Sequence, residues 1–219
     1  MGVVRGVMNR MAKQSAENGR PGLDITGITF APVIKLPKTY EIYDFTEGYD
    51  AGRHRESVYG IGRYNEHRPT MYDAPQYLTE DEPRTVHMGI DIAAPDGEPI
   101  FAFYGGQVYA IADNANPLDY GPTIVTEHHW LGQTVYALHG HLSRESLTKV
   151  AVGQRFSKGQ CLGAVGSMSE NGGWNPHVHF QLSLRAPSTA DMPGVVRLSE
   201  REQALKVYPD PRLVLGALY

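Results

Sequence analysis

The sequence predicts a mainly β protein, built as a single domain with an antiparallel β core and an extended N-terminal lead-in. The 219 residues include 24 glycines and 15 prolines, which interrupt the chain too often for a mainly helical protein. Beyond residue 84, short apolar runs alternate with Gly and Pro, as in a β meander or sandwich. The length also suits one all-β domain.

We expect four parts along the chain. Residues 1–40 are predicted to be a flexible N-terminal segment. Residues 41–83 mix Tyr, Pro, Gly and charged residues without a steady period, which predicts an extended lead-in that packs on the core. The main domain is expected over residues 84–190, and residues 191–219 form a C-terminal extension.

The strands of the core are expected at residues 100–104, 107–111, 123–127, 134–139, 160–165 and 178–184. Residues 95–108 and 152–165 share an order of turn, short strand, glycine and second strand. Two such units facing each other would close a compact core as a duplicated motif. Cys161 lies in an apolar run of the second unit and is predicted to be a small core residue.

Composition argues against several classes of partner. A net charge of -4 offers no broad basic surface, so we expect no nucleic acid partner. The first residues hold no sustained apolar stretch, which predicts neither a signal peptide nor a membrane span. A single cysteine fits a reducing compartment, and we therefore expect a cytoplasmic location.

The segment His177-Val-His-Phe-Gln-Leu-Ser-Leu184 has the clearest alternation in the chain. On a strand, His177, His179, Gln181 and Ser183 share one face, and the apolar residues between them share the other. The two imidazoles then stand about 7 Å apart on the polar face. The simpler interpretation is a solvent-exposed face that happens to carry two histidines.

A second histidine pair lies on the strand predicted over residues 134–141. Alternation places His139 and His141 on the face opposite Tyr136 and Leu138. If this strand pairs with the one that carries His177 and His179, up to four imidazoles meet in one cleft.

A third motif is His87-x-x-x-Asp91. On a straight strand these side chains would be about 13 Å apart, so the backbone must turn between them if they share an ion, and Gly89 permits a turn. With His179 they make two imidazoles and one carboxylate, the ligand count of a catalytic zinc site that keeps a fourth position for water. We expect His141 and His177 beside the metal to orient that water, accept its proton and stabilise the oxyanion.

The three motifs resemble, in order and spacing, those of the lysostaphin-type (LytM-type) zinc metallopeptidases. They are His87-x-x-x-Asp91, then Leu138-His-Gly-His-Leu142, then Pro176-His-Val-His-Phe180. The glycine-containing stretch typical of the family lies between the second and third motifs, at residues 150–160. The resemblance covers about residues 84–184.

The resemblance implies a lysostaphin-like antiparallel β core with a groove, and one zinc ion per chain held by His87, Asp91 and His179. It also implies that His141 and His177 serve catalysis, and that the substrate is a short glycine- or alanine-containing peptide, typically from a peptidoglycan cross-link. Two departures bear on substrate choice. Gln181 stands where Glu is common, and residues 170–176 replace a shorter approach to the last motif.

These departures are similar to a cytoplasmic variant of the domain that occurs beside kinase-like and aminotransferase domains. This likeness implies a functional link to such proteins and a substrate other than the cell wall.

Further residues are weaker candidates for substrate contacts. Trp174 precedes the His177 strand, where an aromatic ring either walls a groove or pins the loop. Tyr64 and Arg68 come from the lead-in, and His139 is either a supporting group or an exposed strand-end residue. The adjacent His128 and His129 are predicted to lie at the surface.

Three functions are compatible with these patterns. The first is zinc-assisted hydrolysis of a peptide or related amide bond. The second is a zinc-binding regulatory module that keeps the fold without catalysis. The third is a non-haem iron oxygenase, because two histidines and one carboxylate also form that metal triad, although the two additional histidines suit hydrolysis better.

Overall fold

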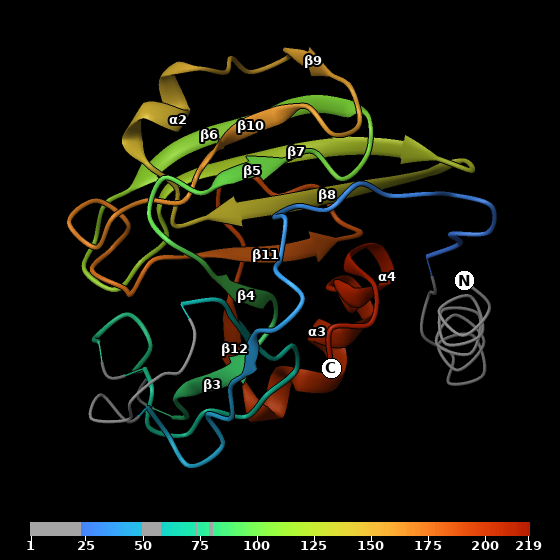
Figure 1. Cartoon of the computed structure of the whole chain (residues 1–219). Helices are drawn as coiled ribbons and strands as arrows, with labels where there is room; N and C mark the ends of the chain where they lie inside the picture. Colours follow the sequence, from blue (N-terminus) through green and yellow to red (C-terminus); the bar gives the residue numbers. More distant parts are fainter. Residues whose placement is uncertain (1–22, 50–57, 73, 79–80) are drawn as a thin grey trace.

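The computed structural model describes residues 23–49, 58–72, 74–78 and 81–219, and their backbone is mainly β (Figure 1). Within these residues the largest sheet has eight strands, in the order β1-β2-β4-β11-β8-β7-β6-β9. Its long central strands are β6 (Gly106–Asn114), β7 (Gly121–Trp130), β8 (Gln133–Gly140) and β11 (His177–Ser183). They pair antiparallel with one another, which confirms the predicted antiparallel core.

The lead-in extends this sheet at one side. Strand β4 (Ile90–Ala93) pairs with β11, and β2 (Gly60–Gly62) pairs antiparallel with β4. Strand β1 (Glu41–Ile42) then adds in parallel to β2. Residues before the main domain are therefore hydrogen-bonded into its sheet next to β4.

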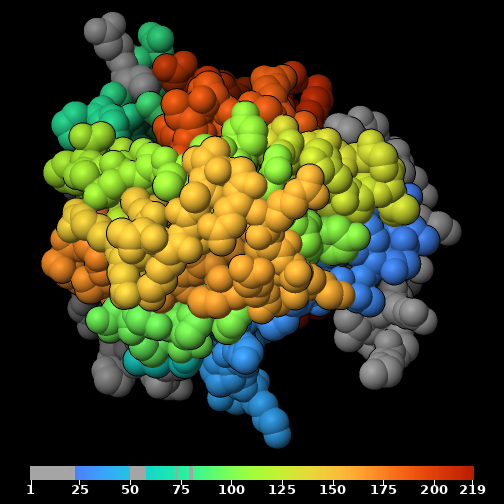
Figure 2. All heavy atoms as spheres, turned by 90° about the horizontal axis from the view of Figure 1, so that it is seen from above, coloured from blue at the N-terminus to red at the C-terminus, as the bar shows by residue number. Residues whose placement is uncertain are grey.

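The two units of the internal repeat pair with each other reciprocally. Strand β5 (Pro99–Phe101) of the first unit pairs with β10 (Cys161–Ala164) of the second. Strand β9 (Arg155–Phe156) of the second unit pairs with β6 of the first. The short helix α2 (Arg144–Thr148) precedes β9, and Figure 2 shows this yellow-to-orange part of the chain covering the face seen from above.

The C-terminal extension packs on the start of the main domain. Strand β12 (Val195–Arg197) pairs with β3 (Arg84–His87) in a small separate sheet, which lies below the large one in Figure 1. A 3₁₀ turn (Leu198–Glu200) and the helices α3 (Arg201–Val207) and α4 (Arg212–Leu215) follow. Over the part of the chain that is described, none of the helices is long and apolar enough to cross a bilayer.

Part of the segment expected to be flexible belongs to the core. Leu23, Val33 and Ile34 are buried, and Ile34 packs with Ile61 of β2 and Ile92 of β4. This burial removes apolar side chains from water and fixes residues 23–40 on the domain. Residues 1–22, the rest of that segment, lie outside the described residues.

Two predictions about single side chains were wrong. Cys161 is exposed, because Leu162, its neighbour on β10, is the residue that turns into the core. His128 is buried, whereas His129 is exposed as predicted. Adjacent residues on β7 point to opposite faces, so one of the two imidazoles enters the core, where His128 contacts the ring of Phe103.

Candidate metal centre

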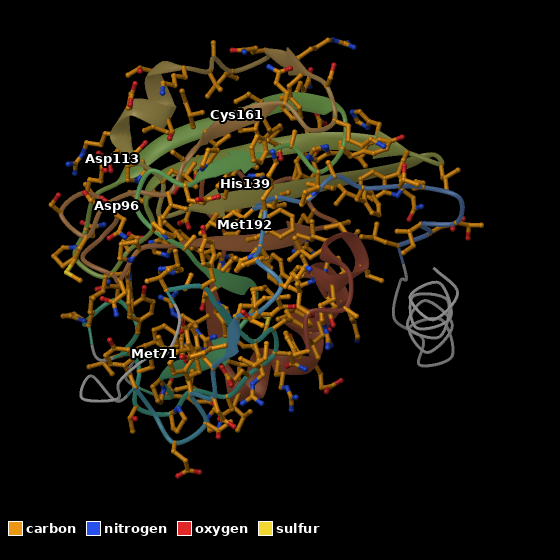
Figure 3. The ribbon with its side chains drawn as sticks, in the orientation of Figure 1. Met71, Asp96, Asp113, His139, Cys161 and Met192 are labelled. Carbon is orange, nitrogen blue, oxygen red and sulfur yellow. The ribbon has the colours of Figure 1, made fainter. Side chains whose placement is uncertain are left out.

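A cavity of about 900 Å³ lies where the lead-in meets the ends of the sheet. Its wall includes His87, Asp91, His141, His177 and His179. Lead-in side chains such as Tyr43, Phe45, Tyr49, Met71, Tyr72 and Tyr77 also line it, as do Trp174 and residues of the 188–195 segment. Met71 and Met192, which are labelled in Figure 3, both line this cavity, so segments far apart in the sequence contribute to its wall.

The chain turns between His87 and Asp91, as it must if both side chains are to bind the same metal ion. Strand β3 ends at His87 and pairs with β12, whereas β4 begins at Ile90 and pairs with β11. Gly89 has no left-handed backbone conformation, so its role differs from the one expected. A Cβ at this position would lie 2.5 Å from the His179 ring, and glycine therefore permits the close approach of that imidazole.

Strand register brings His179 to Asp91. The two residues lie directly opposite each other in the antiparallel β11–β4 pair, and such partners share a face. His179 Nδ1 is 3.0 Å from Asp91 Oδ1. His87 Nε2 lies 3.1 Å from that oxygen and 3.1 Å from His179 Nδ1. Three potential ligand atoms thus form a nearly equilateral triangle.

The outer hydrogen bonds show that this triangle suits a cation. His87 Nδ1 lies 2.8 Å from the Arg63 carbonyl oxygen, so it donates there and leaves Nε2 with its lone pair. His179 Nε2 faces Gln181 Oε1 at 3.0 Å, which leaves Nδ1 as the lone-pair nitrogen. The two ring nitrogens and the carboxylate oxygen that face one another are all acceptors, so none of them can donate a hydrogen bond to the others. Ligands on a tetrahedral zinc ion with bonds of about 2 Å are about 3.3 Å apart, close to the observed spacing.

The charge states of His87 and Asp91 also suit a metal ion. Burial, and then the nearby Arg68 cation, lower the pKa of His87 to about 4, so its imidazole is neutral at pH 7. Burial alone would raise the pKa of Asp91, but His87 and Arg68 outweigh it and hold that pKa well below the usual value. A neutral imidazole and an ionised carboxylate are the forms that bind metals.

His141 and His177 stand together beside this triangle. Their ring centroids are 4.2 Å apart, and His177 Nε2 is 3.8 Å from Asp91 Oδ1. Each Nδ1 faces a backbone carbonyl oxygen, that of Asn171 at 2.8 Å for His141 and that of Asn175 at 2.7 Å for His177. Burial lowers the pKa of both imidazoles, and the neighbouring His177 lowers that of His141 further. Both rings therefore keep Nε2 as a neutral base.

His139 does not accompany His141, so the prediction of a shared face was wrong. Strand β8 ends at Gly140, and His141 has a left-handed backbone with φ of 62°, which breaks the alternation after the strand. His139 pairs in register with Phe180 and contacts its ring in the core, away from the cavity lining. Figure 3 shows its position in the middle of the molecule, between Cys161 and Met192 in that view.

The other candidates for substrate contact differ in position. Trp174 lines the cavity, with its ring centroid 6.3 Å from those of Tyr72 and His141. Tyr64 is not among the cavity-lining residues, and its hydroxyl donates to the Tyr208 carbonyl oxygen at 2.6 Å. Arg68 borders the cavity but is 1% exposed, and it is paired with Asp91 rather than free for a ligand.

Several supporting residues were not predicted. Gln181 was placed on the same strand face as His179 and noticed as a departure from a family pattern, but its contact with His179 was not predicted. The carbonyl of Arg63, which holds His87, comes from the lead-in. The buried Asn171 side chain fixes the loop before β11 by accepting from the backbone N–H of Trp174 at 3.0 Å and donating to its carbonyl at 2.9 Å. Only the unusual sequence of residues 170–176 signalled this loop.

Comparison with known proteins agrees with the motifs. Residues 85–191 match the model of peptidase family M23. Among curated proteins, none matches the chain. One similar solved structure is a mutant catalytic domain of the prophage-encoded M23 protein EnpA from Enterococcus faecalis, with 26% identity, a TM-score of 0.43, and coverage of 64% of this chain and 91% of that one.

Two further similar structures are the lysostaphin catalytic domain and a larger peptidase. For the antimicrobial peptidase lysostaphin from Staphylococcus simulans, identity is 23%, the TM-score 0.43 and coverage 62% of this chain and 89% of that one. For a zinc-containing peptidase from Vibrio cholerae, identity is 25% and the TM-score 0.38, over 50% of this chain and 31% of that one. This chain thus spans about a third of the Vibrio protein. On the match of the family model, residues 85–191 form a domain of peptidase family M23.

Proposed function

We propose that this chain is a zinc-dependent peptidase that holds one zinc ion through His87 Nε2, Asp91 Oδ1 and His179 Nδ1. The observation that carries the proposal is the convergence of these three acceptor atoms at 3.0–3.1 Å, with their outer atoms hydrogen-bonded to other groups. Membership of the domain in a peptidase family supports hydrolysis of a peptide bond as the reaction.

Zinc bound at such a site supplies a Lewis acid for the scissile carbonyl and lowers the pKa of a water molecule to about 7. The side chains supply the proton transfers. A neutral His141 or His177 accepts a proton from the attacking water at Nε2, and the resulting imidazolium passes it to the leaving amine. The carbonyl oxygens of Asn171 and Asn175 hold Nδ1–H of these rings and so direct Nε2. The imidazolium also stabilises negative charge that develops on the substrate oxygen.

The cavity is large enough to hold a short peptide. Its volume of about 900 Å³ exceeds what one amino acid needs, and aromatic side chains of the lead-in line one part of it. We therefore propose a short peptide as substrate, with glycine- and alanine-containing peptides and peptidoglycan fragments as the first compounds to test.

The test separates metal binding from catalysis. His177→Ala is expected to keep one zinc per chain and to lose about 10²–10⁴-fold in kcat/KM on a peptide that the wild type cleaves. The matched control is His129→Ala, which removes an exposed imidazole from β7 and should leave both quantities unchanged. Full turnover in His177→Ala would remove this residue from the proposed mechanism.

The same experiment distinguishes the alternatives. Wild-type protein that binds zinc but cleaves none of a broad panel of peptides and wall fragments would indicate a non-catalytic binding module. Protein that prefers ferrous iron over zinc after metal depletion, and that consumes oxygen, would indicate an oxygenase.

A further inference from the structure

Arg68 reaches the proposed metal ligand Asp91 from outside the family domain. Its Nη1 donates to Asp91 Oδ2 at 2.9 Å, and the side chain is 1% exposed. The family match begins at residue 85, so this contact comes from the lead-in. Asp91 thus offers Oδ1 to the two imidazoles and Oδ2 to a guanidinium.

The guanidinium is held in a fixed direction by several neighbours. Nε donates to Glu66 Oε2 at 2.8 Å, and Nη1 also donates to the Tyr72 hydroxyl at 2.9 Å. The guanidinium carbon lies 4.9 Å from the ring centroid of Phe45. Glu66 is itself bonded to Arg63 Nε at 2.7 Å. Because each contact restricts the rotamer of Arg68, the Asp91 carboxylate meets a rigid partner.

Gly62 leaves the space in which this pair lies. A Cβ at this position would be 2.8 Å from Asp91 Oδ2 and 2.9 Å from Arg68 Nη2. Gly62 is directly opposite Asp91 in the β2–β4 pair. The strand that the lead-in adds to the sheet therefore carries glycine where the carboxylate and the guanidinium meet.

We infer that Arg68 is a positioning residue, which turns the Asp91 carboxylate so that a single oxygen faces the metal. The inference rests on the proposed function. Glu66 has a supporting role, because its charge offsets the repulsion between Arg68 and a nearby dication. A planar guanidinium binds Glu66 and Asp91 in two fixed directions, whereas the ammonium of lysine is a point charge on a flexible chain.

A positioning role of Arg68 and simple charge repulsion predict opposite changes in zinc affinity when the positive charge of Arg68 is removed. Removing a cation near a dication should tighten zinc binding if charge alone mattered. If Arg68 positions Asp91, then Arg68→Met and Arg68→Lys should both weaken zinc binding by about 10–100-fold, the usual effect of losing a partner of a metal ligand. The visible absorption spectrum of the cobalt-substituted protein should also change, because the ligand oxygen moves.

The measurement is the zinc dissociation constant by chelator competition, with the cobalt spectrum, on the full chain. Arg212→Lys is the control, because Arg212 forms a two-point ion pair with Asp210 at 2.7 Å without contacting a proposed ligand. It should retain wild-type values. Zinc affinity in Arg68→Met that equals or exceeds that of the wild type would overturn the inference.

A second variant covers the case in which the Arg68 variants do not fold. Glu66→Gln keeps the shape of the side chain and an acceptor oxygen but removes the charge that holds Arg68. We expect Glu66→Gln to bind zinc at least about threefold more weakly than the wild type and to show a shifted cobalt spectrum. Wild-type values for both would overturn the inference. Wild-type protein that binds no zinc would overturn the proposed function as well, whereas unaffected variants of a zinc-binding wild type overturn the role of Arg68 alone.

Discussion

Gln181 lies two residues beyond His179 on β11 and accepts a hydrogen bond from its Nε2, with 3.0 Å between nitrogen and oxygen. The Gln181 side-chain amide in turn donates to the Pro193 carbonyl oxygen at 3.3 Å, which fixes which way the amide points. The ring of His179 is therefore held with Nδ1 toward Asp91. This relation explains how a buried amide replaces the carboxylate that the resemblance led us to expect.

Replacing Gln181 should weaken metal binding. Gln181→Leu removes the acceptor and should raise the zinc dissociation constant by about 10–100-fold, because the ring loses its orientation and basicity. Gln181→Glu keeps an acceptor with a charge and should bind zinc at least as tightly as the wild type. Ser183→Ala, two residues further on the same face, is the control. Equal zinc affinity in Gln181→Leu and the wild type would refute this role.

Adding a methyl group at Gly89 should displace a proposed ligand. Its Cβ would lie 2.5 Å from the His179 ring and 2.9 Å from the Phe180 carbonyl oxygen. Gly89→Ala is therefore expected to lower zinc affinity by at least about 10-fold. Gly105→Ala is the control, since its nearest neighbour would be 3.7 Å away. Isothermal titration calorimetry of both variants with zinc measures this affinity. An unchanged zinc affinity in Gly89→Ala would show that the His179 ring can move aside without weakening the site.

Replacing Asn171 should lower the rate of catalysis but leave the amount of bound zinc unchanged. Its buried side chain fixes the loop whose backbone carbonyl holds His141. Asn171→Ala should lower kcat, leave one zinc per chain and reduce the free energy of unfolding by about 1–3 kcal/mol, because buried backbone groups lose partners. Asn116→Ala, an exposed residue of a neighbouring loop, is the comparison. Parallel loss of zinc and activity in Asn171→Ala would contradict a role confined to the loop.

Stability should fall as the pH is lowered through the range in which unfolded histidines gain protons. Burial lowers the pKa of His128 to about 3 and that of His139 to about 4. Between about pH 6.5 and these values the unfolded chain binds more protons than the folded one, so each histidine destabilises by up to about 1.4 kcal/mol per pH unit. This destabilisation is absent above about pH 6.5, grows as the pH falls, and reaches its full size below the folded pKa values of about 4 and about 3.

Urea unfolding of metal-free protein at several pH values measures this slope without release of zinc. His128→Asn should flatten the slope by up to one proton, whereas Asn116→Ala, which removes an exposed side chain that does not titrate, should not change it. A slope that is identical in His128→Asn and the wild type would mean that this imidazole is not held neutral in the folded protein.

Local patterns predicted the parts of the site that a single strand or register determines. The alternation from His177 to Leu184 correctly placed His179 and Gln181 on one face, because a regular strand leaves the backbone little freedom. The need for a turn between His87 and Asp91 followed from distance alone. The assignment of His141 and His177 to catalysis stays a prediction, as do the cytoplasmic location and the link to kinase-like or aminotransferase proteins.

Other parts of the site depend on contacts that no local pattern contains. His139 was misplaced because the chain leaves the strand at Gly140 and enters a left-handed conformation at His141, which periodicity does not register. The partners of the proposed ligands, Arg63 and Arg68, lie about 20 residues before them in a segment without a clear period. Their positions follow from the pairing of β2 with β4, a non-local choice of the folded chain.

An anomalous difference map at the zinc absorption edge, from crystals of the full chain grown with zinc, tests the proposed metal site. We predict one peak per chain, within about 2.0–2.2 Å of His87 Nε2, Asp91 Oδ1 and His179 Nδ1. A peak bound by other residues, or the absence of any peak among these three atoms, would contradict it.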